Sequence, residues 1–259
     1  MDNTTFFKEI FSYIVDLYKV SEDERASNFI GCRKYDLDNE TKKTVIKLFK
    51  KIKVTPIKAT IPDKEKIYNF LLSNKKTLSI RTSVSSSKIA PRVVGQSGYE
   101  TFNKVFKPYL NSEIKNQKDI KSFVYNNIAE IMPVFVSFMF QSDYTFYISK
   151  IKEKVTSTIY TRDNVIDIDY RPSKFSFSRS LNDWNESNTI YYQMKNRKIP
   201  IAEVQTHRKR TFKFRFNMKY LPQLIKEEKE TTESLGTSAE YALCEAFNLT
   251  TRLLIMMQK

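Results

Sequence analysis

An alternation of apolar and polar side chains between Ile199 and Leu221 constrains the fold of this chain more than any other feature. In the second half of the segment, Phe212, Phe214, Phe216 and Met218 alternate with Lys213, Arg215, Asn217 and Lys219. In the first half, Ala202, Val204 and Thr206 alternate with Glu203, Gln205 and His207, and a basic turn of Arg208, Lys209 and Arg210 joins the two halves. A period of two residues is typical of a strand with one buried face. The segment is therefore predicted to form a β-hairpin with one apolar face and one polar, basic face.

The hairpin concentrates positive charge in a chain that already has a surplus of it. There are 44 Lys and Arg against 29 Asp and Glu, which gives a formal net charge of +15. Six of the cations lie between Arg208 and Lys219. Like charges so close together repel one another unless a polyanion offsets them, and nucleic acid and an acidic membrane surface are the main candidates. The alternative is a basic surface strand that contributes only solubility.

A two-stranded ribbon fits the major groove of B-DNA, where Gln can pair with adenine and Arg or Lys with guanine. The hairpin residues predicted to contact DNA are Glu203, Gln205, His207, Arg208, Lys209, Arg210, Lys213 and Arg215. Three roles remain open for Glu203: a salt bridge to the neighbouring strand, a contact to cytosine N4, or metal binding. His207 is interpreted as a phosphate or base contact rather than a general base, because the sequence places no fixed carboxylate beside it.

Periodicity elsewhere in the chain predicts a mixed α+β fold. Helices are predicted over residues 5–19, 41–53, 63–73, 99–111 and 117–142. Strands are predicted over residues 78–84, 144–151, 156–160, 165–170 and 189–194, ahead of the hairpin. The expected organisation is an N-terminal helical/β portion at 1–115 with a strand and loop at 78–96, a β-rich portion at 116–228 with the basic hairpin, and a C-terminal helix at 229–259.

Composition narrows the chemistry that is expected of this chain. Four glycines and a single histidine argue against a phosphate-cradling glycine loop and against a His-based metal site. Two distant cysteines, Cys32 and Cys244, indicate a reduced, cytoplasmic protein without a zinc site. The longest apolar run, residues 128–140, contains Glu130 and Pro133 and is too short to cross a membrane. The remaining candidates for catalytic residues are carboxylates. Two or three of them could hold Mg²⁺ beside a basic side chain and so support phosphodiester hydrolysis.

Two segments resemble type II restriction endonucleases. The run Lys76-Thr-Leu-Ser-Ile-Arg-Thr-Ser83 and the following Lys88-Ile-Ala-Pro-Arg-Val-Val-Gly-Gln96 are similar to a Leu-Ser-Ile-Lys-Thr-Asn strand and a Lys-Val-(Cys/Ala)-Pro-Gln-x-Ile-Gly-Gln loop of that family. The hairpin is similar to the family's Gly-Glu-(Phe/Ile)-Gln-(Val/Ile)-His-x-x-Arg segment and the Lys-Phe-Arg-Phe-Asn that follows it. The resemblance implies sequence-specific binding of double-stranded DNA and Mg²⁺-dependent cleavage, by an enzyme that could act as a homodimer.

The same resemblance implies roles for particular residues. DNA contacts are implied for Arg81, Ser83, Lys88, Arg92 and Gln96. Arg81 stands where the family has its catalytic lysine. If the chain cleaves DNA, Asp63 and Glu100, which are carboxylates near basic strands, are the expected catalytic residues and Mg²⁺ ligands. An arginine cannot release a proton as a lysine can. Two functions therefore remain open: a restriction endonuclease, and a catalytically silent DNA-recognition domain of a larger nuclease.

A third segment bears on the organisation of the enzyme. Residues 236–247, Gly-Thr-Ser-Ala-Glu-Tyr-Ala-Leu-Cys-Glu-Ala-Phe, resemble the helix that commonly opens a restriction nuclease domain, yet they come late in this sequence. The chain is accordingly expected to be either a permuted member of the family or the DNA-recognition portion of a longer enzyme. A membrane-surface or RNA-binding module is a third interpretation, which the residues favour less.

Overall fold

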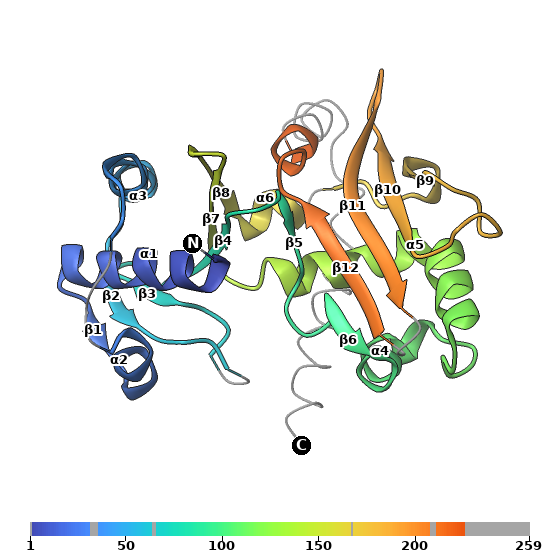
Figure 1. Cartoon of the computed structure of the whole chain (residues 1–259), viewed down its shortest axis with the longest axis horizontal. Coiled ribbons are helices and arrows are strands. Elements are labelled where there is room, and N and C mark those ends of the chain that lie inside the picture. Colours follow the sequence, from blue (N-terminus) through green and yellow to red (C-terminus); the bar gives the residue numbers. More distant parts are fainter. Residues whose placement is uncertain (1, 32–35, 64–65, 167, 208–210, 226–259) are drawn as a thin grey trace. The chain divides into compact units, whose positions relative to one another are not determined.

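The computed structural model describes residues 2–31, 36–63, 66–166, 168–207 and 211–225. They form a mixed α+β fold, as predicted, in two compact units with one sheet each (Figure 1). Unit 1 comprises residues 1–87 and 140–163, and unit 2 comprises residues 88–139 and the described residues from 164 onward. The predicted division at residue 115 falls within unit 2, and the predicted division at residue 228 lies outside the described residues.

Unit 1 is built on a mixed sheet with the strand order β1-β2-β3-β4-β7-β8. Its helices are α1 (Asn3–Tyr18), α2 (Glu24–Ile30) and α3 (Asn39–Ile52). Its strands are β1 (Ser21–Glu22), β2 (Pro56–Ala59), β3 (Phe70–Leu72), β4 (Thr77–Ser83), β7 (Tyr144–Ile151) and β8 (Lys154–Thr161). β4 and β7 are parallel neighbours, with Arg81 opposite Tyr147, although residues 88–139 lie between them in sequence.

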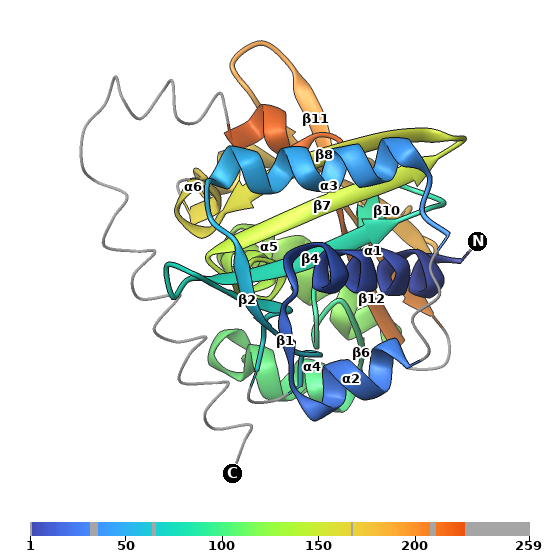
Figure 2. The same ribbon diagram turned by 90° about the vertical axis from the view of Figure 1, so that its left-hand side faces the viewer.

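Aromatic side chains at helical spacing anchor α1 and α3 to one face of the unit 1 sheet. Asp2 caps α1 by accepting backbone N–H bonds of its first turn. Phe11 of α1 packs against Phe70 of β3, with 4.9 Å between ring centroids, and Phe49 of α3 packs against Phe146 of β7 at 5.1 Å. Figure 2 shows both helices lying across the same face of β4, β7 and β8. The predicted helices at 5–19 and 41–53 and the strand at 78–84 are thus confirmed.

Unit 2 is built on a sheet with the strand order β5-β12-β11-β10-β9, and β6 pairs with the first half of β12. Its helices are α4 (Tyr99–Phe106), the 3-10 helix η1 (Lys107–Tyr109), α5 (Gln117–Met139) and the 3-10 helix η2 (Pro172–Lys174), while α6 (Arg162–Ile166) spans the boundary with unit 1. Its strands are β5 (Lys88–Ile89), β6 (Gln96–Gly98), β9 (Phe175–Phe177), β10 (Ser187–Gln193), β11 (Lys198–His207) and β12 (Thr211–Asn217). The predicted strand at 189–194 corresponds to β10.

The predicted hairpin is confirmed as β11 and β12, with its apolar face packed on helices. Phe214 stacks on Phe135 of α5 with 3.9 Å between ring centroids and 2° between ring planes. Phe212 contacts Phe102 of α4 at 4.9 Å. Figure 1 shows α5 running behind this sheet. Because one face is buried in this way, the polar side chains of β11 and β12 are directed to the opposite face.

Two predicted elements are wrong. Residues 63–73 were expected to form a helix, but Phe70 and Leu72 form β3, with both side chains buried in the sheet core. Residues 165–170 were expected to form a strand, but α6 extends to Ile166, and the backbone N–H of Arg171 donates to the carboxylate of Asp169 at 3.0 Å. Such a local side-chain bond turns the backbone and competes with strand pairing.

The predicted C-terminal helix at 229–259 lies outside the described residues. The apolar run at 128–140 falls almost entirely within α5, which also contains Pro133 and departs from helical geometry at Asn127. Among the helices of the described chain, none combines the length and the apolar character that crossing a bilayer requires.

Candidate nucleic-acid interface

The sheet of unit 2 gathers several of the predicted DNA-contacting residues on one side, which we call the polar face. Cross-strand partners share a face of a sheet, so Glu203 lies beside Arg215 and Gln205 lies beside Lys213. The edge strands β5 and β6 add residues by the same pairing with β12. The polar face carries Lys88, Gln96, Glu203, Gln205, Lys213, Arg215 and Asn217. Segments more than a hundred residues apart in the sequence therefore contribute to one surface.

Glu203 is the centre of the polar face. Its Oε2 atom lies 2.5 Å from the Nζ of Lys88 and 3.0 Å from a guanidinium nitrogen of Arg215, and its Oε1 accepts a hydrogen bond of 2.9 Å from the amide of Gln205. The Glu203 side chain is only 10% exposed, and a carboxylate so buried needs such partners. Of the roles left open for Glu203, the structure shows the salt bridge. We call these four residues the Glu203 cluster.

The cluster keeps Glu203 ionised. Burial raises the pKa of the Glu203 carboxyl, but the hydrogen bond from Lys88 and the charges of Lys88 and Arg215 lower it by more, so the pKa lies below its usual value. The carboxylate therefore holds two cations and one amide in fixed positions at neutral pH. Side chains that are already ordered lose less conformational entropy when a ligand binds.

The loop between β5 and β6 is tied to the sheet by backbone hydrogen bonds. The N–H of Phe214 in β12 donates to the carbonyl of Gly95 at 2.9 Å, and the N–H of Gly95 donates to the carbonyl of Pro91 at 3.1 Å. Burial lowers the pKa of Arg92, in the same loop, to about 10. Arg92 is still a cation at neutral pH, so the loop adds positive charge to this edge of the sheet.

Arg81 and Ser83 lie in unit 1, on β4. Arg81 is opposite Tyr147 and Ser83 is opposite Ser149, and the Ser83 hydroxyl donates to the carbonyl of Ser86. Burial raises the pKa of Tyr147, so its phenol keeps its proton. Arg81 thus lies on a hydroxyl-rich part of β4 and β7, and the polar face belongs to the other unit.

The two predicted Mg²⁺ ligands belong to different units. Asp63, in unit 1, lies 2.5 Å from a guanidinium nitrogen of Arg25 and accepts the N–H of Lys66 at 2.6 Å. Glu100 is exposed in the first turn of α4, in unit 2. Within the described ranges, no three His, Cys, Asp or Glu side chains form a group that could hold a metal ion. Mg²⁺ binding by Asp63 and Glu100 stays a prediction.

Part of the predicted interface lies outside the described residues. His207 ends β11, but its side chain and the basic turn of Arg208, Lys209 and Arg210 are not among the parts that the structure describes. The roles predicted for these four residues stay predictions.

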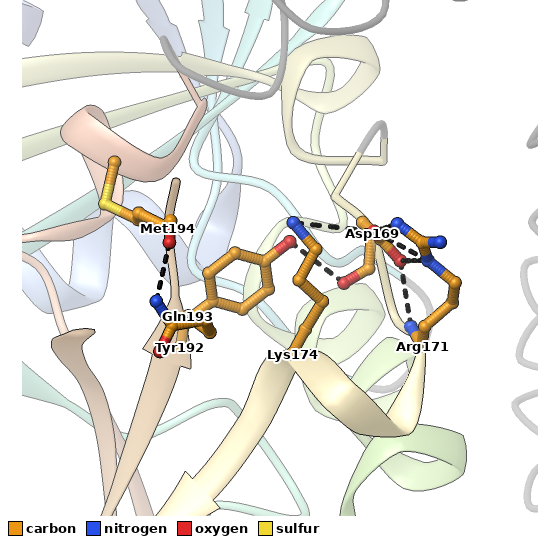
Figure 3. Close-up of polar contacts among 6 residues, drawn as sticks. All are labelled: Asp169, Arg171, Lys174, Tyr192, Gln193 and Met194. Atoms are coloured by element: carbon orange, nitrogen blue, oxygen red, sulfur yellow. Dashed lines mark hydrogen bonds and ion pairs between the residues drawn. The ribbon is translucent and has the colours of Figure 1, made fainter. Parts of the chain in front are cut away.

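A second polar cluster in unit 2 was missed from the sequence. The Asp169 carboxylate lies 2.6 Å from Arg171 and 3.6 Å from the Nζ of Lys174, while the Asp169 carbonyl accepts the hydroxyl of Tyr192 at 3.0 Å (Figure 3). Burial raises the pKa of Asp169, but the hydrogen bonds and charge of Arg171 lower it by more, to below its usual value. These contacts hold the segment before β9 against β10. The run Asp169-Tyr-Arg-Pro172, in which Asp and Pro both favour turns, was the available clue.

Comparisons with known proteins do not identify a family. No family model matches the sequence, and no curated protein is significantly similar to it. The resemblance to type II restriction endonucleases therefore stays a prediction that depends on the short motifs alone.

Proposed function

We propose that the chain binds double-stranded DNA with sequence preference through the polar face of unit 2. The observation that carries the proposal is the Glu203 cluster, in which one ionised carboxylate holds the amide of Gln205 beside the cations of Lys88 and Arg215. In the major groove, the amide of Gln pairs with the edge of adenine, and Arg or Lys pairs with the edge of guanine. The Glu203 cluster holds both kinds of side chain on one sheet.

The electrostatics of this surface support a polyanionic ligand. Glu203 balances only one of the two cations that it contacts, and Lys213 lies next in the cross-strand row, opposite Gln205. Gln96 pairs with Lys213 from the other side, on β6. The surplus of positive charge on this face matches phosphate groups, which supply most of the sequence-independent affinity of DNA-binding proteins.

The geometry of Gln205 suits base recognition. Its amide nitrogen donates one N–H to Glu203 at 2.9 Å, and an amide nitrogen has a second N–H while the amide oxygen is an acceptor. A donor and an acceptor side by side match N7 and N6 of adenine. In this proposal Glu203 acts as a positioning residue that sets the orientation of the Gln205 amide.

The test begins with selection of a preferred duplex from a random library by the purified wild-type chain, without Mg²⁺. Kd values are then measured for the selected duplex and for a scrambled duplex of the same composition. We expect Gln205→Ala to reduce discrimination between them by on the order of 1–3 kcal/mol, the contribution of one good base contact, with little change in affinity for the scrambled duplex.

The matched control is Gln193→Ala, which makes the same chemical change elsewhere in the sheet. Gln193 lies at the opposite end of β10 from the residue that pairs with Gln205, and its amide donates to the carbonyl of Met194 at 2.7 Å (Figure 3). If Gln205→Ala weakened binding to the selected and the scrambled duplex equally, this would argue against base readout by Gln205. Failure of the wild-type chain to select any duplex would overturn the proposed function.

The same selected duplex tests the activity implied by the restriction-endonuclease resemblance. It is incubated with the wild-type chain and Mg²⁺, and the products are separated on a denaturing gel. Discrete fragments would identify the chain as the nuclease itself, and intact duplex with unchanged binding would favour a recognition domain without cleavage.

A further inference from the structure

Val93, in the loop between β5 and β6, has a backbone conformation that a valine rarely adopts. Its φ angle is +64°, and the N–H of Val94 donates to the carbonyl of Arg92 at 2.6 Å. A three-residue turn with positive φ at its centre is a rare and strained γ-turn, and a β-branched side chain makes the strain greater. The other non-glycine residues with positive φ in the described chain are lysines and a glutamate.

The side chain of Val93 is also exposed. It is 44% accessible, and Leu17 and Ile57 are the other large apolar residues that are exposed among those described. Neither of these two has a positive φ angle. Val93 therefore combines two unfavourable features, a strained backbone and an apolar side chain in water, at a single position of the loop.

The surrounding contacts impose this conformation. Both ends of the loop are paired with β12, through Ile89 opposite Phe216 and Gln96 opposite Lys213. Inside the loop, a Cβ atom on Gly95 would come within 2.3 Å of the carbonyl oxygen of Pro91, so the chain closes too tightly there for any other residue. Strain that neighbouring structure imposes in this way is found most often at functional sites.

The position of the loop suggests what Val93 contacts. The loop that carries Val93 joins strands whose residues Lys88 and Gln96 lie on the polar face, so this loop, with the exposed side chain of Val93, borders the surface proposed to bind DNA. The apolar group that DNA offers in the major groove is the C5-methyl of thymine. We infer that Val93 is a specificity-determining residue that contacts a thymine methyl group in the bound duplex. This inference depends on the proposed DNA-binding function.

The test is a double-mutant cycle between a protein methyl group and a DNA methyl group. The selected duplex is made once with thymine and once with deoxyuridine at every thymine position, which removes only C5-methyl groups. Kd values are measured for wild type and for Val93→Gly on both duplexes. The quantity compared is the affinity for the thymine duplex divided by the affinity for the deoxyuridine duplex, called the thymine-to-uracil ratio. We expect this ratio to be about fourfold smaller for Val93→Gly than for wild type, which is the effect of one buried methyl group.

Stability measurements separate this role from a structural one. Glycine adopts positive φ without strain, so the urea midpoint of Val93→Gly should equal or exceed that of wild type. Glu153→Gly is the matched control, because Glu153 also has a positive φ angle, +61°, but lies in the β7–β8 turn of unit 1. It should leave the thymine-to-uracil ratio unchanged.

Several outcomes would overturn the inference while leaving the proposed function intact. These are an unchanged ratio in Val93→Gly, an equal loss of affinity on both duplexes, and a selected sequence that contains no thymine. Absence of any selected duplex is a different result, because it appears before Val93 is varied and contradicts the proposed function itself.

Discussion

At the scale of single residues, two carboxylates, Asp23 partly buried and Glu203 buried, organise segments that are distant in sequence. Asp23 accepts the N–H of Ala26 at 3.0 Å as the N-cap of α2, and it also binds the hydroxyl of Thr60 at 2.6 Å and the Nζ of Lys66 at 2.8 Å. Glu203 has a similar role in unit 2. Each carboxylate replaces the water that it loses on burial with several donors, and this is what lowers its pKa.

The pH dependence of stability should reveal the contribution of Asp23. Burial raises its pKa, but the hydrogen bonds from Lys66, Thr60 and Ala26 lower it by more, to about 2. Because this pKa is below that of the unfolded chain, the stabilisation is present above about pH 4 and is lost as the pH falls through the folded value. We expect Asp23→Asn to lower the free energy of unfolding by about 2 kcal/mol at neutral pH.

The measurement is urea unfolding at neutral pH and at about pH 2.5, where protonation removes most of the difference between Asp23→Asn and wild type. Asp2→Asn is the control, because Asp2 caps α1 in the same way but is fully exposed. Its difference from wild type should be small at both pH values. If Asp23→Asn lowered the free energy of unfolding equally at both pH values, the charge of Asp23 would not be the source of the stabilisation.

At the scale of elements, the hairpin depends on its aromatic face. Phe214 stacks on Phe135 and contacts Phe216 at 5.0 Å between ring centroids, and it is completely buried. We expect Phe214→Ala to lower the free energy of unfolding by about 3–5 kcal/mol, because it leaves a cavity between β12 and α5. Urea unfolding checks this value.

The neighbouring position provides the control for the hairpin. Lys213→Ala changes a side chain on the polar face and should alter stability by no more than about 0.5 kcal/mol. If Phe214→Ala and Lys213→Ala changed the free energy of unfolding equally, the stack of Phe214 on α5 would not be what stabilises the hairpin.

Elements also differ in how well the sequence predicts them. α1 and β12 follow simple periods of apolar residues, so both were predicted from local sequence. β5 and β6 are two and three residues long, too short to show a period. Only their pairing with β12 makes them strands. β3 is also too short to show a period, and its apolar residues 70–72 form a strand because they pair with β2 and β4 on either side.

At the scale of the whole molecule, the net charge of +15 predicts strongly salt-dependent DNA binding. The contribution of each cation should nevertheless depend on its place in the fold. We expect Lys213→Ala to reduce the slope of log Kd against log salt concentration by about 1, the effect of one lost phosphate contact. Fluorescence anisotropy of the scrambled duplex over a range of salt concentrations measures this slope.

Lys104→Ala is the matched control for this slope. It removes the same charge from an exposed position on α4, the helix whose Phe102 packs on the apolar side of the sheet. We expect its slope to equal that of wild type. Equal reductions in both variants would mean that net charge, rather than the polar face, determines the salt dependence.

The sequence by itself determined the features that depend on neighbouring residues: the alternation that makes the hairpin, the apolar stripes of α1 and α3, and the excess of cations. Tertiary structure decided which distant residues meet. Lys88 contacts Glu203 across 115 positions of sequence, and the strained residue Val93 lies in a loop whose two ends are both paired with β12. The physical reason is that periodicity reports which face of an element is buried, whereas the partners on the other face follow from strand order and register. These are set by packing of the whole sheet and leave no local signal in the sequence.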